Sequence, residues 1–174
     1  MAIIGVMGSG TKEWPELTTP LGIWLAENGY DLLTGGGQGV MLSVARAFFN
    51  TKGRTGRSIG ILPSQPHPNL GFVSLPGYPN PFVDLPILTP LPRREASTPD
   101  DAVTRNHINV LASDVIIALP GEYGTLDEIR LARSFAKPLL GFGPAEAFGA
   151  FPESVEVTSD FGVVQEFIGR FPFH

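Results

Sequence analysis

The stretch DVIIALPGEYGT, residues 114–125, decides the fold class of this chain. Residues 114–119 form a short apolar run rich in Val and Ile, which is typical of a strand buried on both faces of a sheet. A proline–glycine turn follows at 120–124, and a helical pattern covers 125–136. The stretch therefore predicts a strand that leads through a glycine turn into a helix.

The same succession of strand, glycine turn and helix occurs elsewhere along the chain. Strands are predicted at residues 2–7, 30–34, 58–62, 114–119 and 139–142. Helices are predicted from the Thr19-Pro20 pair to Gly29, over 40–49, from the cap-like residues 97–101 to about Ala112, and over 125–136. This alternation predicts an α/β fold, a Rossmann-like doubly wound parallel sheet with helices on both faces, formed by residues 1–174 as a single domain.

The 21 glycines and 17 prolines make up about 22% of the 174 residues, below the level of about 25–30% that indicates disorder. Ten of the prolines lie within residues 63–99. Because proline cannot donate to a sheet ladder, this region is predicted to be mostly loop with at most short or edge strands. The tail over 143–174 is weakly patterned, with one short helix expected near 163–168.

The composition narrows the classes of function. The net charge of −5 argues against nucleic acid and an anionic membrane as partners. The chain has no cysteine and three histidines, so we expect no metal site. We find no basic leader and no apolar run of 18 residues, which favours a cytoplasmic protein without a membrane span.

Three strand-to-helix turns are rich in glycine, and in a parallel sheet such turns meet at the carboxyl edge, where ligands bind. Their backbone N–H groups and the helix N-termini that follow suit a phosphate group. No turn continues as G-K-[ST], and the first lacks G-x-G-x-x-G, which disfavours a P-loop ATPase and a dinucleotide dehydrogenase. The predicted ligand-binding residues are Gly8, Ser9, Gly35, Gly36, Gly37, Gln38, Gly39, Gly121, Glu122, Tyr123, Gly124 and Thr125.

Four charged residues admit both a structural and a functional interpretation. Glu128 closes a T-x-x-E capping box with Thr125, or it places a carboxylate over a bound phosphate or ribose. Arg105 lies either on the surface of its helix or in the site. Arg93 and Arg94, at the end of the proline-rich region, either close over an anion or remain solvated. Asp127 and Glu122 are expected to be solvated.

Residues 120–128 resemble the PGGxGTxxE signature of the LOG family, the cytokinin-activating phosphoribohydrolases often mislabelled as lysine decarboxylases. Residues 35–41 resemble a shortened form of that family's GGGxxGLM loop, and Arg105 lies 15 residues before Pro120, where the family keeps an arginine. The resemblance covers residues 3–142. It implies a homodimer or higher homo-oligomer that binds a nucleoside 5′-monophosphate and cleaves its N-glycosidic bond without a cofactor, with Arg105 and Glu128 as catalytic residues.

Two departures from that signature keep other functions open. Glu122 replaces its second glycine, and Asn106 stands where LOG enzymes carry lysine. An Arg-Asn pair resembles the related molybdenum cofactor carrier proteins, which implies a pterin phosphate as cargo without turnover. A nucleotide-sensing module is a third possibility. The DNA-processing protein DprA has a similar fold, but the acidic charge does not suit DNA. Lysine decarboxylation would need a lysine to hold pyridoxal phosphate, and Lys12, Lys52 and Lys137 lie in no suitable motif.

Overall fold

A computed structural model of the chain describes residues 2–149, 151–152 and 155–171. Its main sheet has seven strands, and every pair of neighbours in it is parallel. In spatial order they are β6 (Leu85–Leu88), β3 (Ser58–Leu62), β2 (Asp31–Thr34), β1 (Ile3–Met7), β7 (Val115–Ala118), β8 (Leu139–Phe142) and β9 (Val157–Thr158). Strand β7, which contains most of the apolar run at 114–119, lies next to β1 near the centre of the sheet.

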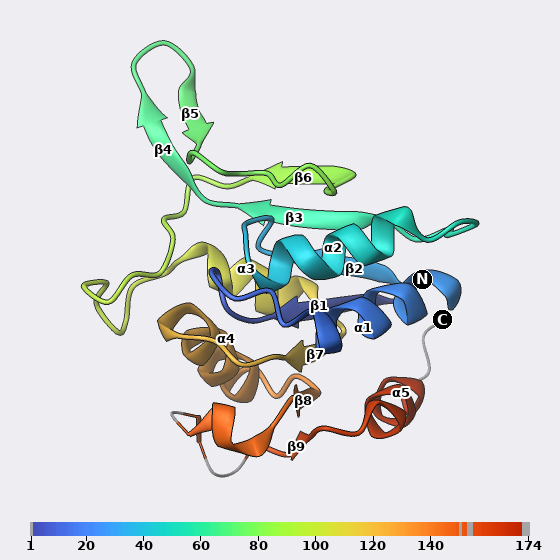
Figure 1. The fold of residues 1–174 in the computed structure, drawn as a ribbon. Coiled ribbons are helices and arrows are strands. Elements are labelled where there is room, and N and C mark those ends of the chain that lie inside the picture. Colours follow the sequence, from blue (N-terminus) through green and yellow to red (C-terminus); the bar gives the residue numbers. More distant parts are fainter. Residues whose placement is uncertain (1, 150, 153–154, 172–174) are drawn as a thin grey trace.

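Helices cover both faces of this sheet (Figure 1). Side chains alternate between the faces along each strand, so Ile4 and Val6 of β1 join one core while Met7 joins the other. The first core is closed by α1 (Pro15–Glu27), α2 (Val40–Asn50) and α5 (Phe161–Gly169). The second lies under α3 (Arg105–Ala112) and α4 (Tyr123–Ser134). The predicted doubly wound α/β fold is confirmed.

The strand order reverses between β1 and β7, and this reversal positions the site. From β1 the chain proceeds toward β2 and β3, whereas from β7 it proceeds the other way to β8 and β9. The turns that follow β1 and β7 are joined by a hydrogen bond from Ser9 N to Pro120 O of 3.1 Å. In open α/β sheets a crevice for ligands forms beyond the carboxyl ends of the strands at such a point.

Two predicted helix starts are wrong. Helix α1 begins at Pro15, where a missing N–H costs nothing, and the Thr18 hydroxyl donates to Trp14 O at 3.0 Å. Pro20 therefore lies inside the helix, and the hydrogen bond that it removes would have ended on Glu16 in the exposed first turn.

Helix α3 begins at Arg105 and not at residues 97–101. The segment before it is held in turns by Arg94, which donates to Pro99 O at 2.7 Å and to Asp100 at 2.8 Å. The helix itself is capped by His107, whose Nδ1 accepts a hydrogen bond from Thr104 N at 3.2 Å. Pro99 and Asp100 thus serve a loop contact instead of a helix end.

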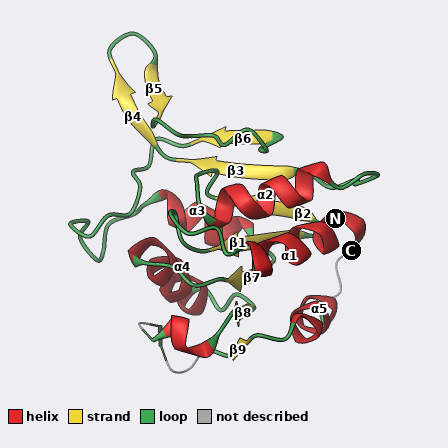
Figure 2. Ribbon diagram, in the orientation of Figure 1, coloured by secondary structure: helices red, strands yellow, loops and turns green. Residues whose placement is uncertain are grey.

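The proline-rich region is mostly loop with short strands, of which one lies at the edge of the main sheet, as predicted. A hairpin of β4 (Ser64–His67) and β5 (Gly71–Ser74) projects from the body, and β6 forms the outer strand of the sheet (Figure 2). The tail carries more structure than predicted. A 3-10 helix, η1 (Ala145–Phe148), and strand β9 follow β8, so residues 139–142 are not the last strand. The predicted short helix in the tail is α5.

Among the residues that the structure describes, no helix is long and apolar enough to cross a membrane.

Candidate functional site

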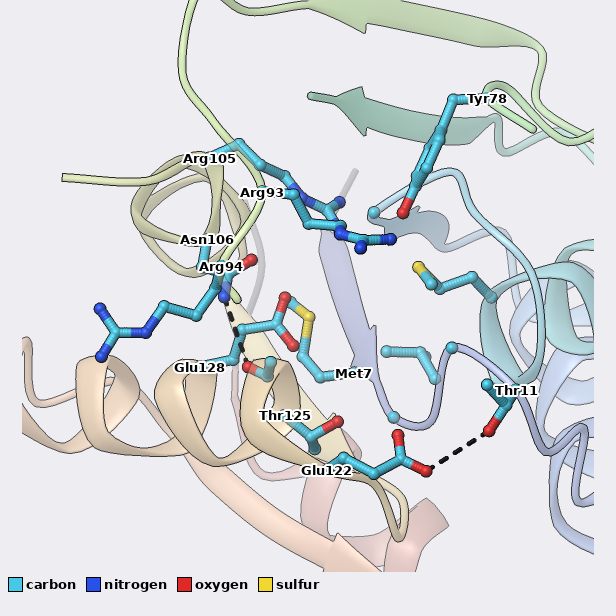
Figure 3. A pocket seen from close by; sticks show the side chains of 16 residues that line it. Met7, Thr11, Tyr78, Arg93, Arg94, Arg105, Asn106, Glu122, Thr125 and Glu128 are labelled. Carbon is cyan, nitrogen blue, oxygen red and sulfur yellow. Dashed lines mark hydrogen bonds between the residues drawn. The ribbon is translucent and has the colours of Figure 1, made fainter. Parts of the chain in front are cut away.

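A cavity of about 240 Å³ opens at the reversal point between β1 and β7. Its walls come from the turn after β1, the first turns of α3 and α4, and the proline-rich region, which contributes Tyr78 and Arg93 (Figure 3). This volume lies just below the range of about 300–1,000 Å³ of common ligand sites. The cavity therefore suits one small molecule rather than a dinucleotide.

Arg105 and Glu128 face each other in the cavity wall. Arg105 is the first residue of α3, is 5% exposed, and donates from Nη1 to Ile61 O at 2.9 Å. Glu128 lies in the second turn of α4 and is 7% exposed, and its Oε1 accepts from Asn109 Nδ2 at 2.7 Å. Because α4 begins at Tyr123, Glu128 lies too far along the helix to cap it. The capping-box interpretation of Glu128, and that of Arg105 as a surface residue, are both wrong.

Burial gives Glu128 unusual acid–base properties. Loss of solvation raises the pKa of Glu128 to about 7, although Arg105 and the hydrogen bond from Asn109 both favour the ionised form. The same loss of solvation lowers the pKa of Arg105, against the attraction of Glu128. A carboxyl group with a pKa near 7 holds or releases a proton under ordinary conditions, as a general acid or base must.

A buried polar cluster joins α3 to α4 beside this pair. Asn106 Nδ2 donates to Asp127 Oδ2 at 2.9 Å and to Gly124 O at 3.3 Å. Arg94 Nε lies 3.6 Å from Asp127 Oδ1. Asp127 is 8% exposed, so the expectation that it is solvated is wrong. The cluster fixes the starts of both helices and leaves Arg94 engaged with protein groups.

Glu122 is exposed, as expected, but it does not stand free in solvent. Its carboxylate accepts hydrogen bonds from the Ser9 hydroxyl at 3.1 and 3.2 Å and from the Thr11 hydroxyl at 3.4 Å. Ser9 Oγ in turn accepts from the backbone N–H groups of Thr11 and Lys12. A negative charge of the protein itself is therefore bound at the turn after β1 (Figure 3).

The glycines of the second turn make room for other parts of the site. A Cβ on Gly35 would lie 1.8 Å from Arg105 Nη1, and one on Gly37 would lie 2.8 Å from the Tyr78 ring. Gly39 has φ +63° and approaches the turn after β1, where a Cβ would lie 2.3 Å from Ser9 O. These glycines admit the arginine and tyrosine of the cavity and the neighbouring turn.

The structure brings about half of the predicted site residues to the cavity. Those that line it are Gly8, Gly35, Arg105, Glu122, Gly124, Thr125 and Glu128. Those that do not line it are Ser9, Gly36, Gly37, Gln38, Gly39, Gly121 and Tyr123. Gln38 donates to Gly77 O at 3.1 Å, and Tyr123 is 66% exposed.

Sequence reasoning missed several residues of the site, among them Tyr78, which lines the cavity, and Asn109, which donates a hydrogen bond to Glu128. Tyr78 lies in a long proline-rich segment with no periodicity to place it, and Asn109 resembles any polar residue of a helix. The only available signal was the spacing of Asn109 from Arg105, because residues four apart lie on the same face of a helix.

A doubly wound parallel sheet with a polar cavity at its reversal point defines a Rossmann-like, ligand-binding protein. Within that class, the profile of the SLOG cluster4 family matches residues 1–163, and the chain belongs to this family. The resemblance to the LOG and DprA group is thus confirmed. An uncharacterized protein of Archaeoglobus fulgidus is 31% identical over 143 residues, 81% of this chain and 80% of the relative.

Solved structures extend the comparison. The molybdenum cofactor binding protein of Rippkaea orientalis is 31% identical with a TM-score of 0.70, and the match covers 97% of this chain and 96% of that one. The molybdenum cofactor carrier protein of Chlamydomonas reinhardtii is 29% identical with a TM-score of 0.66, covering 97% and 98%. DNA processing protein A of Helicobacter pylori, which binds single-stranded DNA, is 16% identical with a TM-score of 0.68, covering 98% and 82%, and shares the fold.

Proposed function

We propose that this protein binds a phosphorylated pterin of the molybdenum cofactor type in the cavity and carries it without turnover. The observation that carries the proposal is that the Glu122 carboxylate accepts hydrogen bonds from the hydroxyls of Ser9 and Thr11. It lies at the start of α4, where the phosphoribohydrolase resemblance would need a glycine and a substrate phosphate. The similarity to two molybdenum cofactor proteins over 97% of the chain supports the same class of ligand.

A second candidate is the phosphoribohydrolase, and Glu128 is the observation that favours it. In that reaction the bond between C1′ of the ribose and the base nitrogen breaks, the base leaves with a proton, and water adds to C1′. The transition state resembles an oxocarbenium ion, which a nearby carboxylate stabilises. Ionised Glu128 would take that role, and Arg105 would orient the substrate.

The test compares the two candidates on one preparation. The protein is expressed in a host that makes molybdenum cofactor, and the fluorescence of oxidised pterin in the purified sample is measured. The same preparation is incubated with AMP and prenylated AMP and assayed for free base and ribose 5-phosphate. A carrier gives bound pterin and no release, whereas ribose 5-phosphate would overturn the carrier proposal. Binding of nucleotide with neither outcome would indicate the nucleotide-sensing module.

Substitution of Glu128 separates the candidates further. Glu128→Gln should abolish release of ribose 5-phosphate by an enzyme but leave pterin bound to a carrier. Glu27→Gln is the matched control, because Glu27 is exposed at the end of α1 that leads into β2, at the opposite edge of the sheet.

Assembly and location remain predictions. Light scattering of the purified protein tests the expected homodimer or higher oligomer. Fractionation of the source cells tests the cytoplasmic location, and a DNA-binding assay tests the expectation that nucleic acid is not a partner.

A further inference from the structure

The cavity has two ends of opposite charge (Figure 3). Arg93, Arg105 and Tyr78 lie at one end, and Glu122 lies at the other, beside Thr11 and Thr125. A ligand with one anionic end has one favourable orientation in such a site. The sequence motifs alone would place its phosphate over the turn at the start of α4, and the contacts of the two ends argue for the opposite orientation.

The end at Glu122 is unfavourable for a phosphate. The carboxylate already accepts the hydrogen bonds that the Ser9 and Thr11 hydroxyls would give to an anion. A phosphate beside it would place two like charges together at the N-terminus of α4 and cancel much of the benefit of the helix dipole.

The opposite end carries unused positive charge. Arg94 is engaged by Pro99 O and Asp100 and lies near Asp127. Arg105, by contrast, uses Nη1 for Ile61 O and has a buried Nε without a partner. Arg93 makes a half-exposed ion pair with Glu95 at 3.2 Å and a hydrogen bond with the Tyr78 side chain, and neither partner is buried deeply enough to hold it away from the cavity.

Arg93 and Arg105 also act on each other. Loss of solvation is the main cause that lowers the pKa of Arg105, and the like charge of Arg93, which lines the same cavity, lowers it further. Tyr78 stands over both: its ring centroid is 5.8 Å from Arg105 Cζ, and a hydrogen bond with its side chain raises the pKa of Arg93. An anion between the two arginines would relieve this repulsion and form charge-assisted hydrogen bonds.

The Glu122 end has free space and a free acceptor. A Cβ on Gly10 or Gly124 would meet no atom within 4 Å, and both glycines line the cavity beside Glu122. A carboxylate offers about four acceptor positions, and the Ser9 and Thr11 hydroxyls occupy only part of them. Two adjacent N–H donors on the edge of a heterocycle pair with a carboxylate through two parallel hydrogen bonds. Pterin and guanine both present such an edge, and adenine does not.

We propose that the ligand's phosphate binds between Arg93 and Arg105 beneath Tyr78, while Glu122 accepts hydrogen bonds from the N–H edge of its pterin- or guanine-like ring. This inference rests on the proposed binding of a phosphorylated heterocycle and assigns its orientation and ring chemistry. Glu122 thereby becomes the residue that selects against adenine.

The first experiment locates the phosphate. Fluorescence titration gives the ratio of the affinities for neopterin 3′-monophosphate and for neopterin. The native protein should prefer the phosphate by about tenfold or more, and Arg93→Gln should remove most of this preference. Arg93 is about half exposed, so the variant should fold. Thr125→Val should leave the ratio unchanged. The control Lys52→Gln removes one positive charge at the opposite edge of the sheet.

The second experiment tests which heterocyclic ring the protein prefers. Calorimetry should show GMP bound about tenfold or more tightly than AMP, and Glu122→Gln should abolish that difference. Equal affinity of the native protein for GMP and AMP would overturn the role of Glu122. A phosphate preference lost in Thr125→Val and kept in Arg93→Gln would overturn the orientation while leaving the proposed function intact. Absence of binding to all four probes would overturn the proposed function, and this inference with it.

Discussion

Replacement of Glu128 by glutamine should stabilise the protein at alkaline pH. Glutamine keeps an oxygen that accepts from Asn109 Nδ2, a hydrogen bond of 2.7 Å in the native chain, and it removes a buried ionisable group. The folded state holds a proton on Glu128 up to about pH 7. An unfolded chain releases it near pH 4.5, so the native protein loses stability as the pH rises between these values.

The size of this loss of stability follows from the difference between the two pKa values of Glu128. The difference between 4.5 and about 7, at about 1.4 kcal/mol per pH unit, corresponds to about 3 kcal/mol. By linkage, the native protein has lost less than about 1 kcal/mol of this stability at pH 5 and nearly all of it by pH 8. The advantage of Glu128→Gln over the native protein should therefore grow by about 2 kcal/mol between pH 5 and pH 8.5.

Urea unfolding at a series of pH values, followed by circular dichroism, measures this difference. Contributions of other titrating groups are common to both proteins and cancel in the comparison. Glu27→Gln controls for the loss of one negative charge on an exposed surface. A difference between Glu128→Gln and the native protein that is the same at pH 5 and pH 8.5, or a less stable variant at pH 8.5, would refute the assignment of a raised pKa to Glu128.

Two further substitutions test the contacts that hold the edge of the sheet and the room for Arg105 in the site. Asp84→Ala removes the acceptor of two 2.8 Å hydrogen bonds from Arg54 and of one from Ser58 N. It should lower the free energy of unfolding by about 2 kcal/mol. Unfolding in urea measures this change, and an unchanged midpoint would contradict the prediction. Gly35→Ala places a Cβ 1.8 Å from Arg105 Nη1, so it should displace the arginine, cost about 1–3 kcal/mol and abolish ligand binding in the neopterin phosphate titration. Native affinity in this variant would show that Arg105 does not contact the ligand.

The sheet could be predicted because its signals are local. The apolar runs that became β1, β2, β3, β7 and β8 are short, and all but β3 end at glycine turns. Burial of a strand on both faces of the sheet requires such an apolar composition. Strand β9 has two residues, too few to show a period. The starts of α1 and α3 were predicted wrongly because they were placed at Pro20 and Pro99. A proline is compatible with a loop as well as with the first turn of a helix.

The polar contacts of the site could not be predicted for a different reason. Asp127 was expected in solvent, and its burial depends on Asn106, 21 residues earlier and on another helix. The carboxylate of Glu122 is placed by Ser9, 113 residues away. The sequence does not show which group a charged side chain will contact. Only the folded structure therefore distinguishes a carboxylate that is bound by protein groups from one that is solvated.

The origin of Tyr78 and Arg93 in the proline-rich region has a consequence for how ligand preference is encoded. Arg105 and Glu128 stand on helices packed against the sheet, where a change of position would disturb the core. Tyr78 and Arg93 stand outside regular structure, in the loops before and after β6. Exchange of the loops on both sides of β6 between related chains, with β6 left in place, should therefore transfer the ligand selectivity while the sheet is retained.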